Sequence, residues 1–255
     1  MTVSASHAFA VWRRNATMYR RTWTWNILPN FFEPVLYLVS IGVGVGAYIS
    51  NMAGMTYLEF IAPGLVCVAA MNGASFEVTY NIFVRMNFEK AYDAMLTTPI
   101  QPVDILAGEV LWAVTRSALY GCCFFAVLLV AGLAPWPYSF WVLPVVPLTG
   151  LLFSAVGLAF TLSIRVIEFF SFYFTLFLTP LFLFSSVFFP AEERLPPGLL
   201  WVAELLPLLH PVRLARAAFR GEMSMLVLWD IAYIVLVATV LLLFGVRRMH
   251  HRLTQ

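Results

Sequence analysis

Charged residues are scarce in this sequence. They make up 11% of its 255 residues, whereas 62% are hydrophobic and the mean hydropathy is +0.86. A soluble domain of this length carries about 25% charged residues, because most of its surface contacts water. The composition therefore excludes a soluble enzyme and predicts an integral protein of the plasma membrane. A net charge of +2 gives no electrostatic argument for nucleic-acid binding.

Residues that build common catalytic and metal sites are also few. The three cysteines lie inside apolar runs without ligand spacing, so neither a disulfide framework nor a metal site is expected. The one lysine, Lys90, follows Glu89, which rules out the phosphate-binding motif G-x-x-x-x-G-K-[ST]. The sequence also lacks H-E-x-x-H, and the stretch Gly73–Glu77 lacks the closing glycine of a nucleophile elbow. We expect no catalysis, cofactor or metal in this chain.

Long apolar runs dominate the rest of the chain. A membrane-spanning helix needs roughly 20 mainly apolar residues. Six runs meet this requirement, near 27–49, 61–84, 108–132, 140–164, 168–190 and 227–246. The sequence therefore predicts an all-α membrane protein with six transmembrane helices in one transmembrane domain, residues 27–246.

A seventh, shorter apolar piece covers about 198–212 and contains Glu204 and His210. Pro207 and Pro211 interrupt it. A short, proline-broken stretch is typical of a re-entrant or interfacial element rather than a full span. We expect such an element within an outer segment, 191–226, with Glu204, His210 and Arg216 as its polar candidates.

Lysine and arginine distribution predicts the orientation. Cytoplasmic flanks of spanning helices are enriched in these residues. With the N-terminal region 1–26 and the tail 247–255 inside, ten basic residues fall on the cytoplasmic side and four, all in 191–226, fall outside. Both termini are therefore expected in the cytoplasm. Arginines precede the first apolar run, which starts near Ile27, so that run is not expected to be a cleaved signal.

Residues 8–25 have the pattern of an amphipathic helix lying on the membrane. An aromatic-rich stripe recurs every three or four residues. It comprises Phe9, Trp12, Ala16, Tyr19 and Trp23, with Arg13, Arg14, Arg20 and Arg21 beside and behind it. The arginines can meet anionic headgroups. Two interpretations remain open: a basic anchor that fixes topology, or an elbow helix that carries movement from a cytoplasmic partner.

The longest cytoplasmic piece between spans is the segment 85–107. It contains a short amphipathic helix whose apolar side chains share a face, while its charged side chains point elsewhere. The apolar residues are Phe88, Tyr92, Met95 and Leu96, and the charged ones are Glu89, Lys90 and Asp93. Pro99 is expected to end the helix and Pro102 to prevent an immediate restart. The apolar face would be displayed to the cytoplasm and covered by headgroups or by a partner's groove.

Glu77 is the main polar candidate within a span. A carboxylate in hydrocarbon is costly unless it is paired, protonated or hydrated. Helical spacing places Asn72, Glu77 and Tyr80 within one broad sector. They form either part of a translocation pathway or a polar contact between helices. Arg116 of the third span either pairs with Glu77 or extends to the inner membrane surface.

Several stretches, in order along nearly the whole chain, resemble the permease subunits of type-2 ABC exporters. Among these, they are similar to the NodJ-like lipo-oligosaccharide exporters. The stretches are Ala62–Gly64, Asn72–Glu77, Phe83–Met86, Ala94–Leu96, Asp104–Glu109, Pro147–Leu151, Phe170–Pro180, Phe189–Pro190 and Leu206–His210. One departure is Pro211, where the branch often has Ser after this histidine, which puts the local structure of the outer element in question.

The resemblance implies a homodimer of six-span subunits working with two separate NodI-like ATPases, which bind ATP and Mg. It places the family's coupling helix on Glu89–Pro99, its connecting helix on 8–25 and its outer re-entrant helices on 191–220. The candidates for ATPase contact are then Phe88, Glu89, Tyr92, Asp93, Met95, Leu96 and Pro99. Those of the connecting helix are Trp12, Arg13, Arg14, Tyr19, Arg20 and Arg21.

The expected function is that of the transmembrane subunit of an ATP-driven exporter in a bacterial inner membrane. The resemblance implies a lipid-linked or amphipathic cargo: a lipo-oligosaccharide, a polysaccharide–lipid conjugate or a hydrophobic drug. Two alternatives remain open. One is a channel or ion-coupled transporter that uses Glu77, and the other is a membrane scaffold that does not transport.

Overall fold

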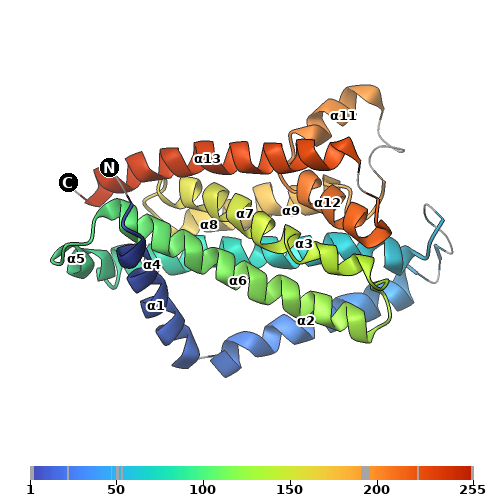
Figure 1. Ribbon diagram of the computed structural model, residues 1–255, viewed down its shortest axis with the longest axis horizontal. Helices are drawn as coiled ribbons and strands as arrows, with labels where there is room; N and C mark the ends of the chain where they lie inside the picture. The colour runs from blue at the N-terminus through green and yellow to red at the C-terminus, as the bar shows by residue number, and fades with distance from the viewer. Residues whose placement is uncertain are drawn as a thin grey trace.

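The computed structural model describes residues 3–21, 23–46, 48–49, 52, 54–190, 196–222 and 224–253. Apart from one isolated bridge between Met52 and Met55, the regular structure of these residues is helical. Most of the long helices run along the long axis of the molecule, and the N- and C-termini lie at the same end (Figure 1). The expectation of an all-α protein is confirmed.

The helices follow one another along the chain as short and long elements. They are α1 (Ala5–Arg21), α2 (Trp23–Gly44), α3 (Tyr57–Phe76), the π-helical turn η1 (Glu77–Asn81), α4 (Ile82–Asn87), α5 (Ala91–Leu96), α6 (Pro102–Val130), η2 (Tyr138–Val142), α7 (Val145–Thr161), η3 (Ile167–Phe169), α8 (Phe170–Phe172), the π-helical η4 (Tyr173–Leu178), α9 (Thr179–Phe184), α11 (Pro197–Glu204), α12 (Leu209–Arg220) and α13 (Met225–Leu253).

Five helical stretches among the described residues are long and apolar enough to cross a membrane. They are Tyr57–Asn87, Pro102–Val130, Tyr138–Thr161, Ile167–Phe184 and Met225–Arg252. They correspond to the last five expected spans. The first expected span falls on α2, where most side chains of 24–34 lie outside the described residues, so the count of six stays a prediction.

Helix ends differ from the expected ones where capping groups decide them. The second span begins at Tyr57 because Thr56 forms a capping box with Glu59. The third begins at Pro102, and the expectation that Pro102 delays a restart is wrong. Proline fits the first helical position, where the missing N–H has no intrahelical partner. The loop between the second and third spans is therefore shorter than 85–107.

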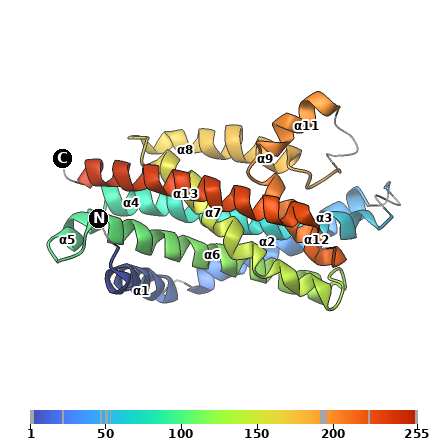
Figure 2. The same ribbon diagram turned by 45° about the horizontal axis from the view of Figure 1, so that its top comes forward.

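The helix α3 forms the centre of the bundle and is buried along most of its length. It packs against α6 and α7, and α13 covers α7 (Figures 1 and 2). The π-helical turn η1 then interrupts the helix before α4. Here Thr161 of α7 donates a hydrogen bond of 2.8 Å to the carbonyl oxygen of Val78. The π-turn is held by a side chain of another helix, so its position follows that of α7.

The helix α1 lies across the bundle near the chain termini and packs on α6 (Figure 1). Its buried face is formed by Ala8, Val11 and Asn15. Gly108 of α6 allows this approach, since a Cβ there would lie 2.6 Å from the Ala8 carbonyl oxygen. Phe9 is exposed and stacks on Trp12 at 5.2 Å between ring centroids, but the expected bounds of the helix, 8–25, are wrong. α1 ends at Arg21, and Trp23, also exposed, belongs to α2.

The outer segment 191–226 contains the helices α11 and α12, which lie at the end of the molecule opposite the termini (Figure 2). Residues 191–195 and 223 lie outside the described residues, and with them Arg194. Exposed aromatic side chains of this half are Trp136, Tyr138, Trp141, Trp201 and Trp229. Exposed tryptophan and tyrosine are typical of a membrane–water interface. The re-entrant character of the segment stays a prediction.

Candidate functional site

The short helix α5 does not display the apolar face that the sequence predicts. Tyr92 is 0% exposed, and Met95 and Leu96 pack partly buried against the same apolar cluster, which includes Ile82 and Ile105. The apolar face is covered by the protein's own helices, because α5 folds back onto the ends of α4 and α6. The expectation that Tyr92 is displayed to the cytoplasm is therefore wrong.

Other residues of this loop remain accessible. Phe88 is 67% exposed, and the side chains of Glu89, Lys90, Asp93 and Pro99 are also exposed. Lys90 adopts a left-handed conformation, with φ of 48°, immediately before α5. The loop thus presents a mixed apolar and charged surface, with Phe88 as its large apolar side chain.

A buried ion-pair network lies directly beneath this loop. Arg85 of α4 donates to Glu77 of η1 and, over 2.5 Å, to Glu109 of α6. The side chains of all three residues are largely buried, with exposed fractions of 12%, 3% and 1%. The sequence signals Glu77 as costly in an apolar run, but Arg85 and Glu109 come together only through the fold.

Arg116 completes the network. Its Nε lies 3.7 Å from Glu77 Oε2, so of the two interpretations left open by the sequence, pairing with Glu77 is confirmed. Two arginines then face two glutamates, Glu77 and Glu109. Breaking a buried ion pair by removing one partner typically costs about 3–5 kcal/mol, because the remaining charge is uncompensated. The network is therefore a structural constraint on η1, α4 and α6.

The helices α1 and α5 both reach this network. Asn15 of α1 donates to Glu109 Oε2 over 3.0 Å, and the Arg116 guanidinium lies 4.4 Å above the Tyr19 ring. From α5, Tyr92 lies in the field of Glu109. Burial, followed by the negative charge of Glu109, raises the pKa of Tyr92 well above its ordinary value. Polar groups from α1, η1, α4, α5 and α6 thus meet in one cluster, the inner network.

The proposed pathway residues do not share one environment. Tyr80 stacks on Phe174 of η4 at 5.7 Å between ring centroids, whereas Glu77 points into the inner network. The expected grouping of Asn72, Glu77 and Tyr80 is therefore corrected. Phe76 joins Tyr80 and Phe174 in the stack and remains 45% exposed. Its spacing of four residues from Asn72 and Tyr80 is the sequence signal that would have found it.

A second buried polar cluster occupies the outer half. His210 is fully buried, with Nδ1 2.7 Å from Asp230 Oδ1 of α13. Arg213 donates to Glu204 over 2.6 Å and to Asp230 over 2.9 Å. Burial opposes the charge of Arg213, but these hydrogen bonds raise its pKa above the ordinary value. The cluster ties α11, α12 and α13 together, and Arg213 and Asp230 were not candidates from the sequence.

The proline that departs from the family pattern fits this arrangement. Pro211 lies in the first turn of α12, where backbone N–H groups have no intrahelical partner. Its carbonyl oxygen accepts a hydrogen bond of 3.3 Å from the Cys67 thiol of α3. The helix therefore forms with Pro211 in place, and the position ties α12 to the centre of the bundle.

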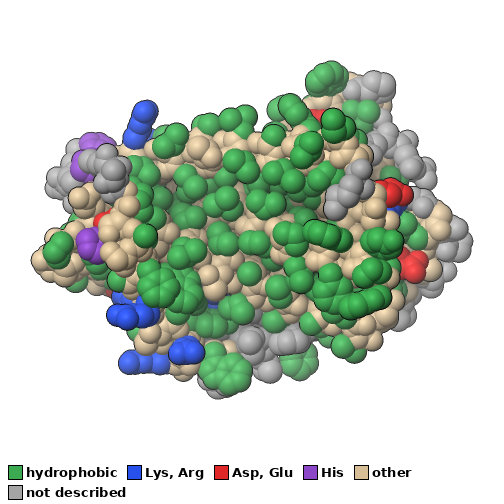
Figure 3. All heavy atoms as spheres, in the orientation of Figure 1, with side chains coloured by type: hydrophobic (Ala, Val, Ile, Leu, Met, Phe, Trp, Pro, Cys, Tyr) green, Lys and Arg blue, Asp and Glu red, His purple; other side chains and the backbone are tan. Residues whose placement is uncertain are grey.

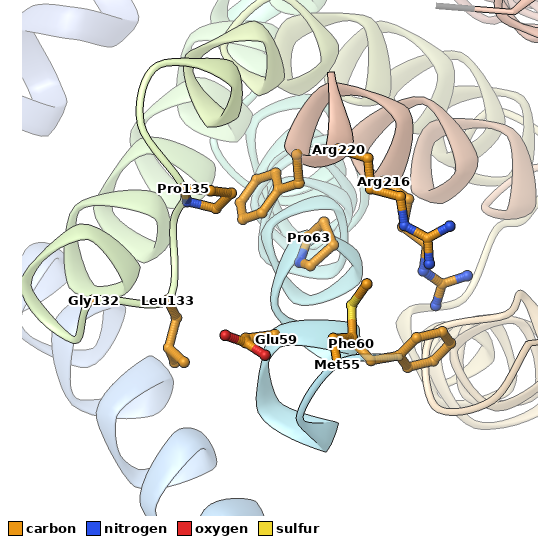
Figure 4. Close-up of a pocket in the computed structure, with 10 residues that line it drawn as sticks. Met55, Glu59, Phe60, Pro63, Gly132, Leu133, Pro135, Arg216 and Arg220 are labelled. Carbon is orange, nitrogen blue, oxygen red and sulfur yellow. The ribbon is translucent and has the colours of Figure 1, made fainter. Parts of the chain in front are cut away.

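A cavity of about 230 Å³ lies beside the outer cluster, between α3, the loop after α6 and α12 (Figure 4). Arg216 borders it and donates a hydrogen bond of 2.9 Å to the Ser186 hydroxyl, with its guanidinium 4.0 Å from the Phe60 ring centroid. Figure 4 shows the Arg216 and Arg220 side chains extending on the same side of the cavity. Among the described residues, no three His, Cys, Asp or Glu side chains are grouped as a metal site requires.

Known proteins resemble this chain over most of its length. Residues 6–219 match the family described as ABC-2 type transporter. Nodulation protein J of Rhizobium leguminosarum bv. viciae is 35% identical over 213 residues, covering 84% of this chain and 82% of that protein. Nodulation protein J of Rhizobium meliloti (strain 1021) is 34% identical over 213 residues, covering 84% and 81%.

A more distant relative is similarly collinear. The inner membrane transport permease YadH of Escherichia coli (strain K12) is 27% identical over 214 residues, covering 83% of this chain and 82% of that protein. The matched region takes in the inner network and the helices α1 to α12. Since the family match and the 35% identity to nodulation protein J both extend over most of the chain, this protein belongs to the ABC-2 type transporter family, as a NodJ-like permease.

Proposed function

We propose that this chain is the transmembrane subunit of an ATP-driven exporter and works as a homodimer with two cytoplasmic ATPase subunits of the NodI-like kind. The family match and the resemblance to nodulation protein J support this assignment. The observation that carries it is the connection between an exposed loop, 88–101, and the buried inner network. ATP and Mg would bind to the ATPase subunits.

The ATPase would contact the exposed side of the loop, where Phe88, Glu89, Asp93 and Pro99 are accessible. Movement of the loop would then reach the spans through Tyr92, a loop residue that is buried and interacts with Glu109 of α6. Met95 and Leu96 pack inward and would hold α5 against α4 and α6. Binding of ATP elsewhere would thus favour one of two arrangements of the spans.

The proposed cargo is lipid-linked or amphipathic, as for the lipo-oligosaccharide exporters that the chain resembles. The stacked rings of Phe76, Tyr80 and Phe174 support this, because they form an aromatic surface on which Phe76 is 45% exposed. Such a face can contact an acyl chain and the flat faces of sugar rings. We propose that Asn72, Phe76 and Tyr80 line the pathway.

The proposed location is a bacterial inner membrane with both termini in the cytoplasm. Arginine side chains gather at the end of the molecule that carries the termini, and hydrophobic side chains cover the middle (Figure 3). This distribution agrees with the positive-inside rule. The amphipathic helix α1 would lie in the headgroup layer of the inner leaflet, with exposed Arg13, Arg20 and Arg21 toward anionic lipids.

The alternative of a proton-coupled transporter using Glu77 is less well supported. The charge of Glu77 is compensated by Arg85 and Arg116, so burial of this carboxylate does not require a proton. The deciding experiment reconstitutes the permease in vesicles with and without its ATPase. We expect export of a lipo-oligosaccharide only with ATPase and ATP, and transport driven by a proton gradient alone would refute the assignment.

A further inference from the structure

A second cavity, of about 340 Å³, lies at the inner end of the molecule between α1, α4 and α6. Its wall includes Arg14 and Tyr19 of α1, Arg116 of α6, and Asn81 and Glu89 on either side of α4. The side chains of Met18, Asn81 and Glu89 at its border are exposed. The cavity thus opens beside the amphipathic helix α1, at the level where we place the inner headgroup layer.

Arg116 carries unused hydrogen-bonding capacity into this cavity. A guanidinium has five N–H donors and no acceptor. Arg116 is 6% exposed, donates to the Tyr120 hydroxyl over 3.3 Å, and its Nε has no hydrogen-bond partner within the described residues. Its nearest carboxylate oxygen, on Glu77, lies 3.7 Å from Nε, beyond hydrogen-bonding distance. The ion pair with Glu77 thus leaves the Nε–H donor without a hydrogen-bond acceptor, and a ligand in the cavity that Arg116 lines can supply one.

Arg14 faces the same cavity from α1. Its Nη1 donates to the Asn15 side chain over 3.2 Å, and its Nη2 lies 3.9 Å from Glu89 Oε2. Two guanidinium groups, one fixed on α6 and one on α1, therefore border one space with donors to spare. Arg85 differs from these two arginines, because both of its terminal nitrogens, Nη1 and Nη2, donate to carboxylates, those of Glu109 and Glu77.

The chemistry of these donors indicates a phosphate group. Arginine binds phosphate oxygens through paired N–H donors, and these charge-assisted bonds are strong where water is excluded. Three arginines and two glutamates line the cavity, a surplus of one positive charge. Glu109, behind Arg85, offsets this surplus, whereas the exposed Arg13, Arg20 and Arg21 make the surrounding surface positive. Glu89 at the mouth opposes an anion.

We infer that this cavity binds the phosphate of a phospholipid headgroup from the inner leaflet, held between Arg116 and Arg14. The bound lipid would join α1 to α6 beside the inner network and fix the angle of α1. This inference rests on the proposed placement of α1 in the inner leaflet but not on the proposed export activity, because it is tested by binding alone, without ATPase or cargo.

The experiment measures binding to the purified full-length protein by native mass spectrometry and by ligand-dependent thermal stabilisation. Three probes separate the possible ligands: dioctanoyl phosphatidylglycerol, dioctanoylglycerol, which lacks the phosphate, and inorganic phosphate. We expect saturable binding of one phosphatidylglycerol per chain and no comparable site for dioctanoylglycerol. Binding of inorganic phosphate with equal affinity would support the phosphate site and identify free phosphate as its source.

Variants locate the site. Arg14→Ala should weaken phosphatidylglycerol binding about tenfold, the equivalent of one charge-assisted hydrogen bond. Arg13→Ala is the matched control, because it removes the same charge from the same helix. Arg13 is exposed and does not line the cavity. This substitution should weaken binding less than about twofold, the effect of general surface charge. Glu89→Gln should tighten binding by removing the opposing charge.

Arg116→Gln tests the buried arm of the site and should also weaken binding at least about tenfold. If this variant fails to fold, Arg14→Ala and Glu89→Gln still decide the question. The inference is overturned if Arg14→Ala and Arg13→Ala weaken binding equally, if neither has an effect, or if dioctanoylglycerol binds as tightly as phosphatidylglycerol.

Discussion

Arg85 and Glu109 lie at the two ends of the loop between the second and third spans, with 2.5 Å between Nη1 of Arg85 and Oε2 of Glu109. Arg85 belongs to α4, which enters the loop, and Glu109 to α6, which leaves it. The ion pair therefore closes the loop at its root, while Glu77 binds the same arginine from η1. A force on the loop would act on α4 and α6 together, rather than on one of them.

The first prediction concerns the stability contributed by this pair. Arg85→Met leaves Glu77 without its principal partner and Glu109 with only Asn15, so the free energy of unfolding should fall by about 3–5 kcal/mol. Thermal unfolding of the purified protein in detergent measures the loss. The double variant Arg85→Met with Glu109→Gln should recover part of it, because one unpaired buried charge is removed. Equal stability of Arg85→Met and the native protein would contradict the network.

The second prediction separates contact with the ATPase from packing within the loop. Phe88 is 67% exposed, so Phe88→Asp should abolish co-purification with the ATPase while leaving thermal stability nearly unchanged. Trp136→Asp is the control, since Trp136 is 78% exposed on the loop after α6, which leads to the outer end. It should leave co-purification intact. Retained co-purification of Phe88→Asp would remove this residue from the proposed contact.

Tyr92 should behave differently from Phe88. Because Tyr92 is 0% exposed, Tyr92→Asp would place a charge in the apolar cluster and lower stability by several kcal/mol, on the order of the cost of burying an unpaired charge. Loss of the ATPase would then follow from misfolding of the loop. Thermal unfolding distinguishes this from a direct contact, for which stability would not change.

The pH dependence of stability provides a further prediction about Tyr92. Its pKa in the folded protein is raised well above the ordinary value of 10.0. Between pH 10.0 and the raised pKa of the folded protein, Tyr92 is deprotonated in the unfolded chain and protonated in the folded protein. The free energy of unfolding therefore falls as pH rises through this range. The native protein should lose about 1.4 kcal/mol per pH unit relative to Tyr92→Phe in that range.

The control for this titration is Tyr138→Phe, since Tyr138 is exposed on η2. The stability of this variant should follow that of the native protein across the same pH range, because Tyr92 is retained. The difference between native protein and Tyr92→Phe is measured from unfolding midpoints between neutral and strongly alkaline pH. Parallel curves for these two proteins would contradict the burial of Tyr92.

The last prediction concerns orientation. Asp93 of α5 and Glu222, which follows α12, are both exposed, and α5 and α12 lie at opposite ends of the molecule (Figure 1). In a background without Cys122 and Cys123, a membrane-impermeant maleimide applied from outside should label Glu222→Cys and not Asp93→Cys. Permeabilised cells should label both, which shows that both positions react. The reverse pattern in intact cells would overturn the proposed topology.

The sequence alone predicted that this protein lies in a membrane and where along the chain its long helices fall. Few charges and long apolar runs require lipid around the chain, and five of the expected spans are found as helices among the described residues. A loop with the short helix α5 does lie between the second and third spans, while its cytoplasmic side stays a prediction. These features depend on the composition and periodicity of each segment, which can be read without knowing what the segment packs against.

Only the tertiary structure decided which side chains meet. The sequence could mark Glu77 as costly, but not that Arg85 and Arg116 pair with it. The helical face of Tyr92 was predicted correctly, while its burial depends on how α5 folds onto α4 and α6. Partner choice depends on distances between helices that are far apart along the chain. A periodic pattern gives the face of a helix, and packing determines what covers it.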